Sequence, residues 1–205
     1  MKTRIKPLSK LFIVISLLSV TSAQGQDTDE NIERKRTFSI ETDPSTFVFK
    51  GYAFHFRFKP KSSQHLQFGA GTYGMDMPNF LVNLNAKNKD NGWKVRISSA
   101  FSLFGEYYFK VANKGTFVGL QLGIQNYKNS NTNQPNIECK YHNLLIMPSI
   151  GFNWQPFRFP LYFKPWLGLG YTRNIAGDNS LDDLTYDVAP ISPFVTLHVG
   201  YTFGK

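Results

Sequence analysis

The chain has 205 residues, of which 16% are aromatic, together with 16 glycines, 11 prolines and one cysteine. This length suits a single domain, and the aromatic, glycine and proline content favours strands and turns over helices. The single cysteine, Cys139, excludes an internal disulfide. The formal charge is +9, but part of it belongs to the extreme N-terminus and the other basic residues are scattered, which argues against nucleic-acid binding.

The N-terminus has the pattern of a secretory signal peptide. Four basic residues precede an apolar run from Leu11 to Val20, and the small residues Thr21-Ser22-Ala23 follow. The apolar run is too short for a membrane-spanning helix, and no cysteine follows it that could accept a lipid. We therefore expect residues 1–23 to be cleaved after Ala23 and the protein to be exported. Residues 24–36 are polar and of mixed charge, which predicts a disordered leader.

Alternating apolar and polar residues predict eight strands after the leader. The connections after the third, fifth and seventh strands are long, and the others are short. Pro148 removes a backbone donor from the sixth strand, where we expect a β-bulge. In chain order, the predicted strands are 37–42, 46–59, 65–75, 93–110, 115–128, 141–155, 161–171 and 195–203; the predicted short turns are 43–45, 60–64, 111–114 and 155–160; and the predicted long connections are 75–92, 129–140 and 173–189.

The longest predicted strand, Trp93 to Lys110, shows the two faces most clearly. Its odd positions are mainly apolar, with aromatic residues at both ends and aliphatic residues near the middle, whereas its even positions are mainly small or polar. A face that crosses hydrocarbon between two headgroup layers has this arrangement. We therefore predict that the odd positions, including Leu103, face lipid along the whole strand, and that Ser102 and Glu106 face a lumen.

Eight such strands predict an all-β fold, an eight-stranded antiparallel transmembrane β-barrel. Outer-membrane barrels keep short turns on the periplasmic side and long loops outside, so residues 37–205 are expected to form a barrel with three long extracellular loops, both ends on the periplasmic side, and a periplasmic leader. The 43–45 turn is then an unusually short outer turn. The 37–42 segment is the weakest strand; it either spans the membrane or sits partly in the barrel mouth.

Several short motifs resemble a known family. These are Thr42-Asp43-Pro44, Gly51-Tyr52, Phe117-Val118-Gly119, Pro165-Trp166-Leu167-Gly168 and Gly200-Tyr201-Thr202-Phe203. Together they resemble small outer-membrane β-barrel proteins of Bacteroidetes-type Gram-negative bacteria, within the eight-stranded, porin-like barrel superfamily. The last motif is similar to the aromatic-ending signal read by the barrel-assembly machinery, although Gly204 and Lys205 follow it. The resemblance implies a location in the cell outer membrane and a fold, and it carries no activity onto particular residues.

The interior of an eight-stranded barrel is only just wide enough to be filled by side chains. Buried charges need partners, and Arg57, Glu106 and Lys164 are predicted at similar depth, so we expect a lumen charge cluster. This cluster is either a structural plug or a path for protons or ions. The predicted inward polar residues are Arg57, Arg96, Glu106, Gln121, Asn153 and Lys164.

No catalytic or metal constellation is evident in the sequence. None of the four histidines has a metal-ligand spacing to another histidine or a carboxylate, and Ser149 and His142 lie on opposite faces of one strand, so they cannot form a dyad. We expect no metal, no cofactor and no enzyme activity. The acidic segment Asp178 to Asp187 either is simply solvated or binds divalent ions that bridge lipopolysaccharide.

The sequence therefore predicts an outer-membrane barrel with a structural or surface-interaction role. The alternative is a narrow channel or carrier for small or apolar solutes, and a lipid-modifying enzyme is a remote third. Expected partners are outer-membrane lipid, lipopolysaccharide and the assembly machinery. The apolar loop residues Phe80, Leu81, Val82 and Leu84 either cap the barrel mouth or bind a protein partner.

Overall fold

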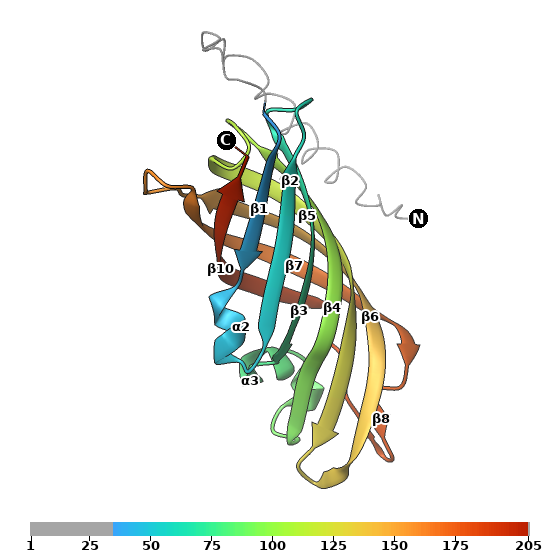
Figure 1. Cartoon of the computed structure of the whole chain (residues 1–205). Helices are drawn as coiled ribbons and strands as arrows, with labels where there is room; N and C mark the ends of the chain where they lie inside the picture. The colour runs from blue at the N-terminus through green and yellow to red at the C-terminus, as the bar shows by residue number, and fades with distance from the viewer. Residues whose placement is uncertain (1–34, 205) are drawn as a thin grey trace, which may run out of the picture. The chain divides into compact units, whose positions relative to one another are not determined.

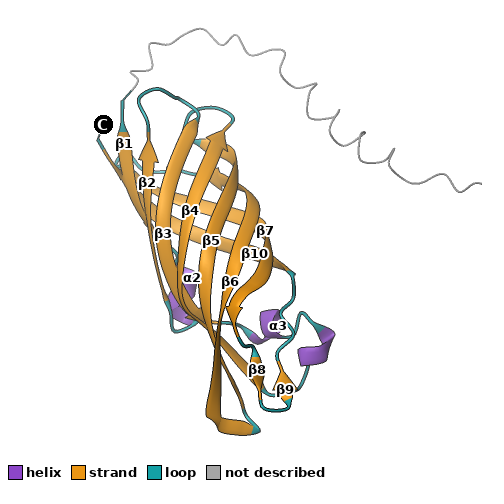
Figure 2. Ribbon diagram, turned by 90° about the vertical axis from the view of Figure 1, so that its right-hand side faces the viewer, coloured by secondary structure: helices purple, strands orange, loops and turns teal. Residues whose placement is uncertain are grey.

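Eight antiparallel strands form a closed barrel in the computed structural model (Figures 1 and 2). The structure describes residues 35–204, so the predicted signal peptide and most of the predicted leader lie outside the described residues. Neighbouring strands follow the order β1-β10-β7-β6-β5-β4-β3-β2, which confirms the predicted fold. The strands are β1 (Thr37–Thr42), β2 (Tyr52–Lys59), β3 (Leu66–Asp76), β4 (Trp93–Tyr108), β5 (Gly115–Asn131), β6 (Gln134–Asn153), β7 (Leu161–Gly177) and β10 (Ile191–Phe203).

The two ends of the barrel carry different connections. At the short-turn end, tight turns join β2 to β3, β4 to β5 and β6 to β7, and β1 begins and β10 ends there. The long-connection end carries every other connection. It contains the helices α2 (Pro44–Val48) and α3 (Asn79–Val82), the 3-10 helix η1 (Ala86–Asn88), and a small sheet of β8 (Ser180–Leu181) and β9 (Leu184–Thr185). Within residues 35–204, no helix is long and apolar enough to cross a membrane.

Strand β1 is a full member of the barrel wall. Its residues pair with β2 on one side and with β10 on the other, from Phe38 opposite Phe203 to Thr42 opposite Val199. The weakest predicted strand therefore closes the barrel and does not lie in its mouth.

The barrel is apolar outside and polar inside. Leu103 on β4 is 66% exposed on the outer surface, whereas Lys164 on β7 and Gln125 on β5 are fully buried in the lumen. Side chains alternate between these two environments along each strand, because successive residues of a strand point to opposite faces. This alternation is the pattern of a barrel whose outer surface meets lipid.

The prediction that β4 keeps one lipid-facing parity throughout is wrong. A β-bulge between Ile97 and Ser99 shifts the pairing of β4 with β5, and a matching irregularity lies between Tyr73 and Met75 on β3. The extra residue reverses the alternation. Trp93, Val95 and Ile97 therefore point inward and are buried.

The bulge also turns Arg96 to the outer face of β4. This residue was predicted to fill the lumen, but it is half-exposed and pairs with Asp76 on β3. It lies on the part of β4 beyond the bulge, where the even positions face outward.

The connection after β1 is also different from the prediction. Thr46 to Phe49 do not begin the second strand, because Asp43 caps a short helix: its side chain accepts a hydrogen bond from Ser45 N at 2.9 Å, and Pro44 occupies the first helical turn. The predicted turn at 43–45 is thus the start of α2.

The predicted polar loop 129–140 is wrong as well. Strands β5 and β6 continue as a hairpin to Asn131 and from Gln134. Tyr127 and Tyr141 stack inside this extension, with ring centroids 5.1 Å apart. Both faces of the extension carry polar residues, so hydropathy alone does not distinguish it from a loop.

The predicted bulge at Pro148 is not formed. Leu120 pairs with Pro148 without a register shift, and the pairing of β6 with β7 has the same register at Ile146 and at Ser149. The shift between β6 and β7 lies instead between His142 and Asn143. The strand accommodates the missing donor without inserting a residue.

Two long connections form an ordered cap at the long-connection end. Val82 from the α3 connection and Leu181 and Tyr186 from the β8–β9 connection join one apolar cluster with Trp93 and Tyr141 of the barrel wall. Burial raises the pKa of the Tyr186 phenol to about 12. The cap therefore has its own small core. Of the apolar loop residues noted in the sequence, Leu81 and Val82 are buried in this region, whereas Phe80 and Leu84 are exposed.

Candidate functional site

A layer of paired charges crosses the barrel lumen. Glu106 on β4 accepts hydrogen bonds from Arg57 Nη1 at 2.7 Å and from Lys164 Nζ at 2.6 and 2.9 Å. The structure thus brings together all three residues that the sequence placed in a lumen cluster. All three are buried, so their charges are compensated inside the protein and not by water.

Two further residues, Glu41 and His198, complete this layer. Glu41 on β1 lies 3.0 Å from Arg57 Nη2 and 3.3 Å from Lys164 Nζ. Its other contacts are Tyr162 Oη at 2.7 Å and His198 Nδ1 at 3.0 Å. We call Glu41, Arg57, Glu106, Lys164 and His198 the lumen charge layer.

Aromatic rings enclose the lumen charge layer. The guanidinium carbon of Arg57 lies 4.4 Å from the centre of the Phe104 ring, and Lys164 Nζ lies 4.7 Å from the centre of the Phe117 ring. A cation over an aromatic face is stabilised by the ring quadrupole. The two cations therefore have both carboxylate and aromatic partners.

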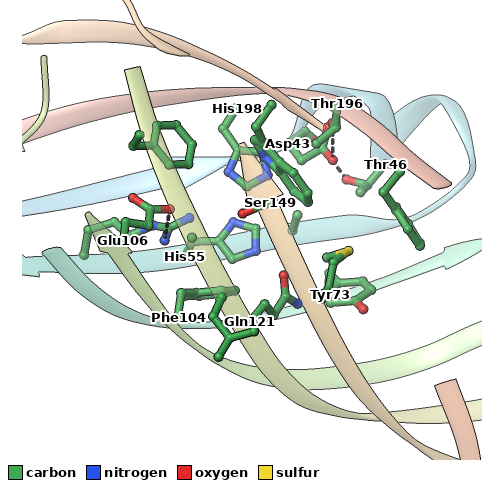
Figure 3. Close-up of a pocket in the computed structure, with 18 of the residues that line it drawn as sticks. Asp43, Thr46, His55, Tyr73, Phe104, Glu106, Gln121, Ser149, Thr196 and His198 are labelled. Carbon is green, nitrogen blue, oxygen red and sulfur yellow. Dashed lines mark hydrogen bonds and ion pairs between the residues drawn. The ribbon is translucent and has the colours of Figure 1, made fainter. Parts of the chain in front are cut away.

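A small cavity lies in the lumen next to this layer (Figure 3). Its volume is about 60 Å³, which is enough for a few water molecules. Two ring nitrogens in its lining, His55 Nδ1 and Trp166 Nε1, are buried and have no hydrogen-bond partner among the described residues. Much of the remaining lining is apolar, including Phe104, Phe117 and Met147.

The cavity reaches an irregular part of the barrel wall. Strand β1 is short, so residues 191–198 of β10 have no ladder pairing with it. Helix α2 lies at this place, against β10, β2 and β3 (Figure 1). Asp43 ties it to β10 by accepting a hydrogen bond from Thr196 Oγ1 at 2.7 Å. Asp43 and Thr46 also line the cavity. We call this place, where α2 replaces strand pairing between β10 and β2, the wall gap.

Two members of the lumen charge layer, Glu41 and His198, form with the neighbouring His55 a group of residue types that can bind a metal ion. One donor atom each from Glu41, His55 and His198 lies within 4.8 Å of the others. However, Glu41 already pairs with Arg57 and Lys164, and a divalent cation at this place would be repelled by both. The His55 and His198 rings are also stacked, with centroids 4.6 Å apart. The charge arrangement therefore favours the ion pairs over a metal.

The residues considered for nucleophilic chemistry are not arranged for it. His142 is exposed and bonds to Asn126 at 2.6 Å. Ser149 lines the cavity with His55 and His198, but within the described residues no hydrogen bond joins its hydroxyl to either ring. In the acidic segment, Asp187 pairs with Lys87 at 3.6 Å, while Asp178, Asp182 and Asp183 are exposed.

Sequence reasoning missed Glu41 and His198 for an identifiable reason. Glu41 lies opposite His55 on β2 and Gly200 on β10. These strands meet only when the barrel closes, so the contacts depend on the register of the closing seam. The alternation of each strand shows that both side chains point inward. Together with the closed strand order, this facing would have placed both residues beside Arg57.

The comparisons with known proteins give structural likenesses only. No protein-family model matches the chain, and no curated protein matches it, so membership of the Bacteroidetes-type family stays a prediction. Similar solved structures include the N-terminal β-barrel domain of Pseudomonas aeruginosa OprF, at 11% identity and TM-score 0.43, covering 83% of this chain and 98% of that chain. Neisserial surface protein A has 10% identity and TM-score 0.40, with 82% and 95% covered. A major outer membrane protein from Thermus thermophilus has 11% identity and TM-score 0.45, with 82% and 99% covered.

Proposed function

We propose that this protein is an outer-membrane β-barrel whose lumen is closed to ions and whose long-connection end is its working surface. The signal-peptide pattern and the apolar outer wall support the location. The main support for a closed lumen is the lumen charge layer, because its charges are buried and paired across the barrel. The proposal includes no catalytic step and no resident cofactor.

The cap supports a role in surface interactions. Asn88 donates to Asp187 O at 2.7 Å and accepts from Asp187 N at 2.9 Å, so the two long connections hold each other in place. Phe80 is 67% exposed on this ordered surface. A pre-ordered surface loses less conformational entropy on binding than flexible loops do. In the proposed orientation the cap faces outward, toward lipopolysaccharide and protein partners.

Conductance across planar bilayers tests the closed lumen. The refolded wild-type protein should give no current steps. A variant with alanine at Glu41, Arg57, Glu106 and Lys164 should admit water and ions. The control, Lys128→Ala/Glu138→Ala, removes a surface ion pair and should stay silent. Regular current steps from the wild-type protein would overturn the proposal and favour a channel.

A second candidate function is a carrier of small apolar solutes, which the wall gap and the adjoining cavity favour. Strand pairing there is replaced by α2, whose Phe47 and Val48 side chains are exposed. Movement of α2 would connect the cavity to the surrounding lipid without breaking a strand ladder. A solute with one acceptor oxygen would complement the unpartnered nitrogens of His55 and Trp166.

Quenching of a single tryptophan tests this candidate. The Trp93→Phe/Trp154→Phe protein keeps Trp166 in the cavity, and a short brominated alcohol should quench its fluorescence. Asp43→Cys/Thr196→Cys, oxidised to tie α2 to β10, should abolish that quenching, whereas the reduced form should retain it. Equal quenching in the oxidised and reduced forms would exclude access through the wall gap.

A further inference from the structure

The two ends of the barrel differ sharply in charge. The long-connection end carries both signs in equal number, whereas the described residues of the short-turn end carry cations and no carboxylate. At the short-turn end the charged residues are Lys35, Arg36, Lys59, Lys61, Lys110, Lys114 and Arg158. At the long-connection end they are Asp43, Asp76, Asp90, Glu138, Asp178, Asp182, Asp183 and Asp187, against Lys50, Lys87, Lys89, Lys94, Arg96, Lys128, Lys140 and Arg173.

Six of these cations are exposed at the short-turn end. Besides Lys35, these are Arg36, Lys61, Lys110, Lys114 and Arg158, and we call these five the basic rim. The ion pairs found among residues 35–204 lie in the lumen or at the long-connection end. The basic rim therefore keeps its positive charge uncompensated by carboxylates of the described chain.

Exposed aromatic side chains lie in and beside the same turns. Phe157 and Phe159 flank Arg158 and stack with ring centroids 4.8 Å apart, and Phe109 precedes Lys110. The exposed aromatic residues of this end include Phe38, Tyr107, Phe109, Trp154, Phe157, Phe159 and Phe203. Aromatic rings gather at the level of lipid headgroups in membrane barrels. The cations are therefore placed at headgroup depth, not far out in water.

We propose that the basic rim binds the phosphate groups of anionic phospholipids in the leaflet at the short-turn end. Lysine and arginine beside an apolar surface extend their charged groups toward the headgroups, and a cation near an anionic lipid surface is attracted to it. The interleaved aromatic rings favour lipid over an anionic polymer that lies outside the membrane, such as peptidoglycan. The inference rests on the proposed membrane location.

Contact quenching by brominated lipid measures this preference. The Trp93→Phe/Trp166→Phe protein keeps only Trp154, which is exposed at the short-turn end. It is refolded into phosphatidylcholine vesicles that contain acyl-brominated phosphatidylglycerol or acyl-brominated phosphatidylcholine. The relative association constant should favour phosphatidylglycerol by about fivefold or more at low salt. High salt should reduce this preference, because the cations are exposed.

A matched pair of variants assigns the preference to the basic rim. In the single-tryptophan protein, glutamine at Lys61, Lys110, Lys114 and Arg158 should bring the ratio close to one. Glutamine at four exposed cations of the other end, Lys89, Lys94, Lys140 and Arg173, removes the same charge and should leave the ratio unchanged.

Each remaining outcome counts against a stated claim. Equal quenching by both lipids in the parent protein overturns the inference, as does an equal loss in the two variants or a salt-independent ratio. Co-sedimentation with peptidoglycan without a lipid preference also overturns it. If the basic-rim variant fails to fold, the salt titration of the parent protein decides alone. Failure of the parent protein to insert into vesicles contradicts the proposed membrane location instead.

Discussion

Removing one carboxylate from the lumen charge layer should destabilise the barrel strongly. Glu106→Ala leaves Arg57 and Lys164 sharing Glu41, at 3.0 and 3.3 Å, so two buried cations face one carboxylate. Breaking a buried ion pair by removing one partner costs about 3–5 kcal/mol. Because both cations keep Glu41 as a partner, we expect a loss of about 3 kcal/mol.

The double variant Glu106→Leu/Lys164→Met separates this charge effect from packing. It removes one anion and one cation and leaves the Arg57–Glu41 pair intact. Replacing a buried ion pair by apolar residues of similar size is often neutral or stabilising, so the double variant should lose much less stability than Glu106→Ala.

Urea titrations in lipid vesicles, followed by the different gel migration of folded and unfolded barrels, give the free energies of unfolding. The surface pair Lys128–Glu138 is the control: Glu138→Ala should cost less than about 1 kcal/mol. A loss from Glu106→Ala no larger than that of the control would refute the reasoning, as would a double variant less stable than Glu106→Ala.

Three further predictions concern facing and the cap. Leu103→Arg places a charge on the lipid-facing wall and should cost about 2–4 kcal/mol of stability, whereas Ser102→Arg places its charge in the lumen beside Gln121. If refolding titrations show the larger loss of stability for Ser102→Arg, the assigned facing of β4 is reversed. Asn88→Ala removes two of the hydrogen bonds that join the two long connections and should make both connections sensitive to protease at once. Cleavage of only one connection would show that they are not coupled. Burial raises the pKa of Tyr186 from its ordinary value of 10.0 to about 12 in the folded protein. Its contribution to cap stability is therefore complete below about pH 10 and is lost as the pH rises toward 12. Protease sensitivity of the cap that does not increase over this range would contradict a buried phenol.

The alternation of side chains made the barrel predictable from the sequence. Lipid and lumen impose opposite polarity on successive residues, so each strand contains its own signal. This signal misleads at the cap, where the inner face of β4 is apolar and its outer face is polar. Beyond the bulge in β4, Trp93 and Ile97 are apolar because they pack against the cap, not because they meet lipid. A one-residue insertion leaves no mark in composition.

The candidate site was predictable only in part for a different reason. Arg57, Glu106 and Lys164 lie on long or strongly alternating strands, so their parity was clear. Glu41 lies on a strand of six residues, and its partners come from register across the closing seam. The short helix after Asp43 was missed because Pro44 also fits a turn, and Asp43 can accept a hydrogen bond from Ser45 N in either structure.

The lumen charge layer also constrains how the barrel assembles. Its members come from β1, β2, β4, β7 and β10, and Glu41 is 157 residues from His198 in sequence. Contacts between segments so distant form late, because the chain must first close a long loop. Until β1 meets β10, Glu41 cannot contact Lys164 or His198, and Lys164 keeps Glu106 as its carboxylate partner. Closing the seam therefore also completes the charge pairing of the lumen, which couples barrel closure to the buried ion pairs.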